Sequence, residues 1–301
     1  MDIVRNIGQS VLSKLKRKAI NEGIAFQQLL TLFLQEEFIR RLSQSEYRNK
    51  LILKGGFLLY TLSDFASRPT IDADYLLRDY PNKVESILSL VHAILLGKTG
   101  NDFIRIEVLD VEEINDMNDY HGVRVYLVGQ IEKTRTPFHI DFGIGDVIVP
   151  FEVKRTIPIL LEGFEQESIL TYSIESIISE KFDAMIRYME ANGRMKDFYD
   201  VYTLAITFSF DGSILKEALY KTLSNRHTLY GIDSAILLRR LIEDEDIKNR
   251  WKNFCKKVLR YDLDFDLVIG VIITLIDPLI QSIESENVFL MNWNPSSRRY
   301  E

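Results

Sequence analysis

Apolar and polar residues follow three patterns along the chain, and these patterns divide it into regions. Over residues 11–41, apolar positions recur at helical spacing among Gln, Glu and Lys, which predicts a pair of packing helices. From residue 51 onward, short apolar runs and alternating segments predict strands, at 51–53, 103–111, 123–130, 137–142 and 147–160. From about residue 165 to the end the pattern is mostly helical, and residues 294–301 read as a loose tail. The sequence therefore predicts a strand-rich first part and a helical second part.

The stretch from Leu51 to Asp74 organises the first part, because it reads as strand, glycine turn, helix (57–64) and second strand. In the alternating segment at its end, Asp72 and Asp74 project to one side while the residues between and beside them project to the other. Two adjacent carboxylates repel each other, and a divalent cation with oxygen ligands relieves that repulsion. The stretch therefore predicts a metal site.

Gly55 and Gly56 lie between the first strand of this stretch and the helix. Glycines let backbone N–H groups approach a ligand closely, and the start of a helix favours negative charge. We therefore predict that this turn binds phosphate beside the metal.

These residues resemble the first motif of a known superfamily, the DNA polymerase β-like nucleotidyltransferases. The resemblance is specifically to the AbiEii toxin family of type IV toxin–antitoxin and phage abortive-infection systems. It rests on the glycine pair and the spacing of the residues after it, Gly55-Gly56 and then Arg68-x-Thr70-x-Asp72-x-Asp74. It implies a polymerase β-like domain, residues 1–165, with a mixed sheet flanked by helices, and a helical bundle, residues 166–301. Two positions depart from the family pattern, since Phe57 replaces a small or hydroxyl residue and Thr70 replaces a frequent serine.

The segment 137–146 carries a further carboxylate. Along the predicted strand, His139 and Asp141 share the face opposite the apolar residues. If this strand neighbours the one with Asp72 and Asp74, Asp141 completes a metal triad, and it lies where the AbiEii-like pattern places its third carboxylate. The alternative is a turn-forming aspartate before Gly143. His139 is interpreted as a surface or supporting residue.

Lys181 lies near the middle of the apolar stripe of a predicted helix over residues 173–191. A lysine in that position is costly unless its stem packs and its ammonium emerges at a cleft or meets an anion. The resemblance implies that the anion is a nucleoside triphosphate, and that Lys181 reaches the cleft from the helical domain. The alternative is a lysine that reaches solvent at a helix–helix interface.

The segment after the predicted helix stop at Asn192-Gly193 resembles the last family motif, with Lys196, Asp197 and Asp200. The resemblance implies that Asp197 is catalytic and that Lys196 binds the nucleotide. Helix capping explains both aspartates equally well. Capping does not explain Arg194 and Lys196, because cations at a helix start oppose its dipole, so an anion is expected near them.

Composition and charge limit which partners and which cellular compartment are expected. The 301 residues contain 44 Asp and Glu against 37 Lys and Arg, a net charge of −7, which argues against a non-specific polyanion binder. The single cysteine, Cys255, excludes an intrachain disulfide and fits a reducing compartment. The longest apolar run, residues 267–276, is too short to span a bilayer, and the first residues lack a signal-peptide pattern. We expect a cytoplasmic protein without a membrane partner.

Taken together, the resemblance implies transfer of a nucleoside monophosphate from a nucleoside triphosphate to RNA, with tRNA 3′ ends as the acceptor class. Two Mg²⁺ ions would be held by Asp72, Asp74 and Asp141, and Lys181 would neutralise the triphosphate. Blocked translation and growth arrest would follow. The family also implies a cognate antitoxin, with or without a stable complex.

Two other functions fit parts of the sequence. Asp141, Glu152 and Lys154 have the spacing of a PD-(D/E)xK nuclease core, although that pattern leaves Gly55-Gly56 and the paired aspartates unexplained. A nucleotide-sensing module without catalysis would instead use the helical part as an interface, including Trp251 and residues 267–276.

Overall fold

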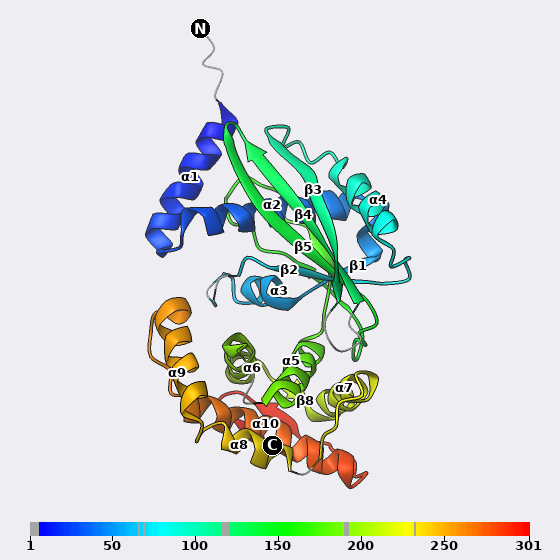
Figure 1. The fold of residues 1–301 in the computed structure, drawn as a ribbon, viewed down its shortest axis with the longest axis vertical. Coiled ribbons are helices and arrows are strands. Elements are labelled where there is room, and N and C mark those ends of the chain that lie inside the picture. The colour runs from blue at the N-terminus through cyan, green and yellow to red at the C-terminus, as the bar shows by residue number, and fades with distance from the viewer. Residues whose placement is uncertain (1–5, 66, 69, 116–120, 190–192, 232) are drawn as a thin grey trace. The chain divides into compact units, whose positions relative to one another are not determined.

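The computed structural model describes residues 6–65, 67–68, 70–115, 121–189, 193–231 and 233–301 (Figure 1). The chain packs as two compact units. Unit 1 takes Met1–Gly145 and Val153–Thr171, and unit 2 takes Asp146–Glu152 and Tyr172–Glu301, each within the described ranges. The predicted domains, 1–165 and 166–301, stay a prediction.

Unit 1 is built on a seven-stranded mixed sheet with the order β3-β4-β5-β2-β1-β7-β6. The pairs β2–β5 and β1–β7 are parallel and the other four are antiparallel. The strands are β1 (Leu51–Lys54), β2 (Ala73–Leu77), β3 (Ile104–Asn115), β4 (His121–Ile131), β5 (Thr134–Gly143), β6 (Val153–Thr156) and β7 (Ser168–Thr171). The predicted α+β class with a mixed sheet and helices is confirmed.

Helices cover one face of this sheet. The helical elements of unit 1 are α1 (Ile7–Glu22), α2 (Phe26–Gln44), the 3-10 helix η1 (Glu46–Asn49), α3 (Gly55–Leu62) and α4 (Val84–Leu95). In Figure 1, α2 passes behind β3, β4 and β5, and α4 lies against β3 and β4. The apolar residues of β4 and β5 point to this face and are buried: Val123, Val125, Leu127, Phe138, Ile140 and Phe142. The half-exposed residues Arg124, Tyr126, His139 and Asp141 occupy the opposite face by alternation.

The predicted packing helix at α2 is present, but four of its charged residues are buried: Glu36, Glu37, Arg40 and Arg41. Arg40 pairs with both glutamates, and Arg41 donates to the backbone oxygens of Leu95 and Ile104, each at 2.9 Å. Burial lowers the pKa of Arg40 to about 10. Every charge meets a partner, so these side chains do not face water. The network joins α2 to the end of α4 and the start of β3.

Unit 2 is mainly helical. Its helices are α5 (Ile174–Tyr188), α6 (Met195–Thr207), α7 (Gly212–Asn225), α8 (Ser234–Arg240), α9 (Glu245–Phe254), the π-helix η3 (Cys255–Leu259) and α10 (Phe265–Glu284). A small antiparallel sheet joins β8 (Phe210–Asp211), β9 (Asn292–Asn294) and β10 (Arg299–Tyr300). The predicted loose tail at 294–301 is therefore wrong. The Trp293 ring is buried and its Nε1 donates to the Ala205 oxygen at 2.7 Å, which anchors the end of the chain.

α10 is longer than the apolar run seen in the sequence, because the helix continues to Glu284. Among the described residues it is the one helix with the length and composition to cross a membrane. However, 56% of its most apolar window is buried inside the structure. Trp251 and most of the apolar residues of α10 are likewise buried, so they form the core of unit 2.

One strand was not predicted. Ser168–Thr171, placed by the sequence pattern in the helical part, is β7 and pairs in parallel with β1. Two of its four residues are exposed or half-exposed, so the strand lacks the apolar run that marks β1.

Candidate nucleotidyl transfer site

A row of charged residues crosses the sheet of unit 1. Register pairs join five adjacent strands at one level, and the five residues are Lys54 (β1), Asp74 (β2), Asp141 (β5), Arg124 (β4) and Glu112 (β3). Residues paired in this way project to the same face. The structure therefore brings Asp74 and Asp141 side by side on neighbouring strands, which was the condition for Asp141 to join the aspartate pair.

The two glycines make room for the aspartates of this row. A Cβ at Gly55 would lie 2.0 Å from Oδ2 of Asp74, and Gly55 has a φ of +70°. A Cβ at Gly56 would lie 2.8 Å from Oγ1 of Thr70, and that hydroxyl accepts a hydrogen bond from the Asp72 N–H at 3.2 Å. The glycine pair thus leaves room for the Asp74 carboxylate and for Thr70, which binds the backbone of Asp72. This role was not predicted, since the sequence assigned the glycines to phosphate alone.

α3 begins at Gly55, two residues earlier than predicted, and the two glycines form its first turn. Its N-cap residue is Lys54, whose side chain has no acceptor for the first-turn amides. Phe57, where the family has a smaller residue, is buried. The arrangement keeps amides and positive charge at the start of α3 next to Asp74.

Asp72 lies just before β2, which begins at Ala73, so strict alternation starts one residue later than expected. Ile71, expected on the core side, is 51% exposed. Oδ1 of Asp72 is 3.5 Å from Nε2 of His139. Nε2 of His139 is buried and makes no hydrogen bond to any described residue, so the supporting role of His139 stays a prediction.

Asp141 is held by a residue that the sequence reasoning missed. Arg124 donates from Nε to Oδ1 and from Nη2 to Oδ2 of Asp141, both at 2.7 Å. The hydrogen bond to Asp141 raises the pKa of Arg124. The tight β4–β5 turn could have revealed this pair, because counting back from the Ile131–Thr134 pair places Arg124 opposite Asp141.

The donor set fits a hard divalent cation at Asp72 and Asp74, since carboxylate oxygens are the ligands that Mg²⁺ prefers. Gly55 leaves room for the Asp74 carboxylate, and Gly56 leaves room for Thr70, whose hydroxyl accepts from the Asp72 N–H. In the described part of the chain, no three His, Cys, Asp or Glu side chains gather as ligands of one ion. Both oxygens of Asp141 accept hydrogen bonds from Arg124. The role of Asp141 as third ligand stays a prediction.

In unit 2, Lys181 meets two buried carboxylates. Its Nζ lies 2.8 Å from Oδ1 of Asp197 and 2.7 Å from Oδ2 of Asp200. The Lys181 side chain is 11% exposed and those of Asp197 and Asp200 are 0% and 3% exposed. The anion expected beside this lysine therefore includes an acidic pair within the fold, and Lys181, Asp197 and Asp200 form one ionic cluster.

The same cluster explains the basic residues at the start of α6. Arg194 is the N-cap residue, and its Nε is 2.8 Å from Oδ2 of Asp197. Asp197 lies in the first turn, so it is not the N-cap that the sequence allowed. Burial alone would raise the pKa of Asp197, but the charges of Lys181, Arg194 and Lys196 lower it. The predicted helix stop at Asn192 lies outside the described residues.

A second ionic cluster in unit 2 involves Asp183 of α5. Asp183 is buried and accepts from Arg187 and Arg226. Arg226 also pairs with Asp146 at 2.6 Å. Burial by itself would lower the pKa of Arg226, but the charges of Glu180 and Asp146 raise it. This cluster ties α5 to the end of α7 and to the segment 146–152, which is a structural role.

The nuclease pattern is not assembled. Asp141 is on β5 and Lys154 is on β6, and three strands separate β5 from β6 in the sheet. At about 4.8 Å per strand, the two backbones are about 19 Å apart. Glu152 belongs to the segment that packs in unit 2. The three residues share a sequence spacing without sharing a site.

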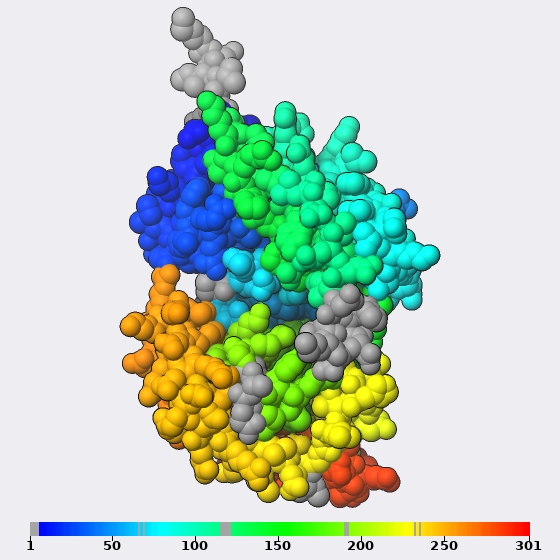
Figure 2. All heavy atoms as spheres, viewed as in Figure 1, coloured from blue at the N-terminus to red at the C-terminus, as the bar shows by residue number. Residues whose placement is uncertain are grey.

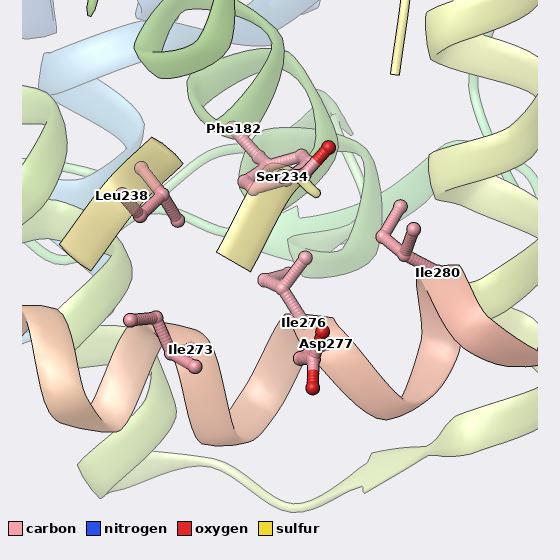
Figure 3. A pocket seen from close by; sticks show the side chains of 7 residues that line it. All are labelled: Phe182, Ser234, Leu238, Ile273, Ile276, Asp277 and Ile280. Carbon is pink, nitrogen blue, oxygen red and sulfur yellow. The ribbon is translucent and has the colours of Figure 1, made fainter. Parts of the chain in front are cut away.

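A small cavity in unit 2 lies between α5, α8 and α10 (Figure 3). Its lining is mostly apolar, with Phe182, Ser234, Leu238, Ile273, Ile276, Asp277 and Ile280. Its volume of about 10 Å³ corresponds to roughly one water molecule. This cavity cannot hold a nucleotide.

Residues 37–271 match the family described as nucleotidyl transferase AbiEii toxin, type IV TA system. This range covers more than half of the chain and includes the sheet row and the Lys181 cluster. The chain belongs to the AbiEii family. It is therefore a nucleotidyl transferase toxin of a type IV toxin–antitoxin system, as the motifs indicated.

Two solved structures resemble this AbiEii protein. JHP933 from Helicobacter pylori is 18% identical with a TM-score of 0.50, covering 87% of this chain and 97% of that one, and it shows the shared fold. A second H. pylori structure, described as a candidate nucleotidyltransferase, is 16% identical with a TM-score of 0.46, over 88% of this chain and 100% of that one. No curated protein matches the sequence.

Proposed function

We propose that this AbiEii protein transfers a nucleoside monophosphate from a nucleoside triphosphate to the 3′ end of an RNA, with tRNA as the acceptor class. The reaction depends on Mg²⁺ and blocks translation in the cytoplasm. Such a toxin serves phage defence by abortive infection and is restrained by a cognate antitoxin. The observation that carries the proposal is the close fit of Asp74 and Thr70 against the glycine pair at the start of α3.

This fit supports a phosphate and metal site because it brings together Asp72, Asp74 and the backbone amides of the first turn of α3. Asp72 and Asp74 would hold Mg²⁺, and the first turn of α3 would receive phosphate oxygens. When bound, the ion neutralises phosphate charge and lowers the pKa of the attacking hydroxyl. Lys54, on the same row, adds positive charge beside the phosphates.

The chemical step is an in-line displacement. The oxygen of the RNA 3′ hydroxyl forms a bond to the α-phosphorus, and the bond from that phosphorus to the bridging oxygen of the β-phosphate breaks. Pyrophosphate leaves with the electron pair, and the hydroxyl proton passes to water. The first turn of α3 orients the phosphates, and Lys54 supplies a fixed positive charge beside them.

We also propose that Lys181 serves the triphosphate, as the family implies, with Asp197 holding its ammonium group. Two charge-assisted bonds of 2.7 and 2.8 Å fix Nζ, and both carboxylates are themselves buried. A fixed ammonium stabilises phosphate charge without reorganising during the reaction. Lys196, in the first turn of α6 beside Asp197, adds to the positive charge there.

The proposal is tested by incubating purified protein with Mg²⁺, total small RNA and each labelled nucleoside triphosphate in turn, followed by a denaturing gel. We expect label on tRNA-sized RNA with the wild type, none with Asp74→Asn, and none when the metal is chelated. Asp102→Asn, an exposed aspartate elsewhere in unit 1, is the matched control and should label normally. Equal labelling by a folded Asp74→Asn protein would contradict the proposal.

A further inference from the structure

The open face of β4 and β5 carries a patch that the reaction as described does not use. In Figure 2 the atoms of these strands (green) reach the surface on the side facing the viewer, and α2 and α4 pack against the opposite face of the sheet. Arg124, Tyr126 and His139 project from this face, and we call these three residues the acceptor patch.

Arg124 in this patch is held in one orientation. Its Nε and Nη2 bind the two oxygens of Asp141, and its Nη1 is 4.0 Å from Oε1 of Glu112. The Arg124 side chain is 32% exposed, so the guanidinium reaches solvent. Because Asp141 occupies the Nε and Nη2 side of the guanidinium, Nη1 and the second N–H of Nη2 are the donors that remain for a phosphate oxygen.

Tyr126 and His139 form an aromatic pair next to Arg124. They are register partners on β4 and β5, with ring centroids 6.1 Å apart and an interplanar angle of 57°. The Tyr126 hydroxyl donates to Glu112 at 2.5 Å, which fixes the tyrosine ring. Paired aromatic side chains on a sheet are the surfaces on which proteins stack the bases of single-stranded RNA.

The geometry of an in-line displacement indicates which substrate lies near this patch. This inference rests on the proposed function. In an in-line displacement the acceptor oxygen approaches from the side opposite the leaving pyrophosphate. The phosphate end of the site is at β1, β2 and the start of α3. Arg124 lies two strands beyond Asp74, at about 10 Å, and three beyond Lys54, at about 14 Å.

We propose that the acceptor patch binds the 3′-terminal nucleotides of a single-stranded RNA end, with a backbone phosphate on Arg124 and a base on Tyr126 and His139. Asp141 acts through Arg124, as a positioning residue. Acidic residues of β3 border the patch, at Glu107, Asp110 and Glu112, and they disfavour backbone phosphates beyond the one on Arg124.

The test measures RNA binding and nucleotide binding separately. A fluorescent single-stranded RNA ending in a free 3′ hydroxyl is titrated by anisotropy, without nucleoside triphosphate, against wild type, Arg124→Lys, Tyr126→Ala and Tyr126→Phe. We expect Arg124→Lys and Tyr126→Ala each to weaken RNA binding about tenfold, and Tyr126→Phe to keep near-normal binding. Binding of each nucleoside triphosphate should change less than about twofold.

Arg135→Ala is the matched control, because it removes an exposed arginine from the same face of β5, six residues from Asp141. It should leave RNA binding unchanged. Asp141→Asn keeps the side-chain shape and should weaken RNA binding in step with Arg124→Lys, with normal nucleotide affinity. A metal-ligand role would instead weaken Mg²⁺-dependent nucleotide binding.

Three results would overturn the proposal: unchanged RNA binding in the patch variants, an equal loss with Arg135→Ala, or a loss confined to nucleotide binding. Failure of the proposed function looks different. In that case the wild type would transfer no label to any RNA, although the anisotropy titrations would still report whether the patch binds an RNA end.

Discussion

The two units each hold a carboxylate against a cation, but in opposite surroundings. In unit 1, Arg124 and Asp141 are 32% and 19% exposed, on an open sheet face. In unit 2, Lys181 is 11% exposed against Asp197 at 0% and Asp200 at 3%. An ion pair near water can exchange its partner for a ligand at little cost, whereas a buried pair cannot lose a partner without leaving an unpaired charge. We therefore expect the Arg124 pair to contribute to recognition and the Lys181 cluster to contribute to both stability and chemistry.

The largest expected effect is the loss of Lys181. Lys181→Met leaves Asp197 and Asp200 as neighbouring buried carboxylates, so we expect unit 2 to lose about 3–5 kcal/mol of unfolding free energy. Tryptophan fluorescence during urea unfolding measures this, because both tryptophans, Trp251 and Trp293, lie in unit 2. Lys252→Ala, an exposed lysine on α9, is the control and should change stability by less than about 0.5 kcal/mol. Equal stability of the two variants would mean that the buried cluster is not needed.

Gly55→Ala should have the next largest effect. The new methyl would lie 2.0 Å from Oδ2 of Asp74, and the φ of +70° is strained for alanine. We expect a loss of about 1–3 kcal/mol of stability in unit 1 and loss of RNA labelling. Gly100→Ala separates the two causes, because Gly100 has a φ of +75° but open space around it. If Gly100→Ala abolished labelling as well, backbone strain in general and not contact with Asp74 would be responsible.

The pH dependence of unit 2 sharpens the comparison further. The folded-state pKa of Asp197 lies below its ordinary value of 3.8, so its stabilisation is present above that value and is lost as the pH falls through the folded pKa. We expect the unfolding free energy of unit 2 to decline below about pH 4, and to decline less in Asp197→Asn. If the unfolding free energies of the wild type and Asp197→Asn, from the same fluorescence measurement, changed equally with pH, the lowered pKa of Asp197 would be contradicted.

The smallest expected effect on stability belongs to the exposed pair. Arg124→Ala should lower the stability of unit 1 by no more than about 1 kcal/mol, since solvent screens the pair. Hydrogen exchange of the β5 amides measures this locally. A loss as large as that in Lys181→Met would show that both ion pairs are structural, and the contrast between the units would disappear.

Much of this architecture follows from local sequence patterns. The β1–α3–β2 order and the strands β4 and β5 were predicted because apolar runs, glycines and alternation are local signals. β7 was missed because four residues with polar positions give no clear run. The ordered tail was missed because its stability comes from Trp293, which packs against residues almost 90 positions earlier.

In the candidate site, too, residues in local motifs could be predicted, whereas their partners from distant segments could not. Asp72, Asp74 and Asp141 could be named from a family motif and strand alternation, and the structure places Asp74 beside Asp141. The partners of these groups depend on pairings between distant segments, so Asp200 was not recognised as a partner of Lys181. The buried charges of α2 could not be predicted for the same reason, because a helical pattern alone assigns them to solvent.

The most direct test of the central claim compares pyrophosphate released with nucleotide incorporated into RNA, in the same reaction. The account predicts one pyrophosphate for each nucleoside monophosphate attached, with both products absent for Asp74→Asn and normal for Asp102→Asn. Pyrophosphate released without any incorporation, or equal yields from the Asp74→Asn protein, would contradict nucleotidyl transfer at this site.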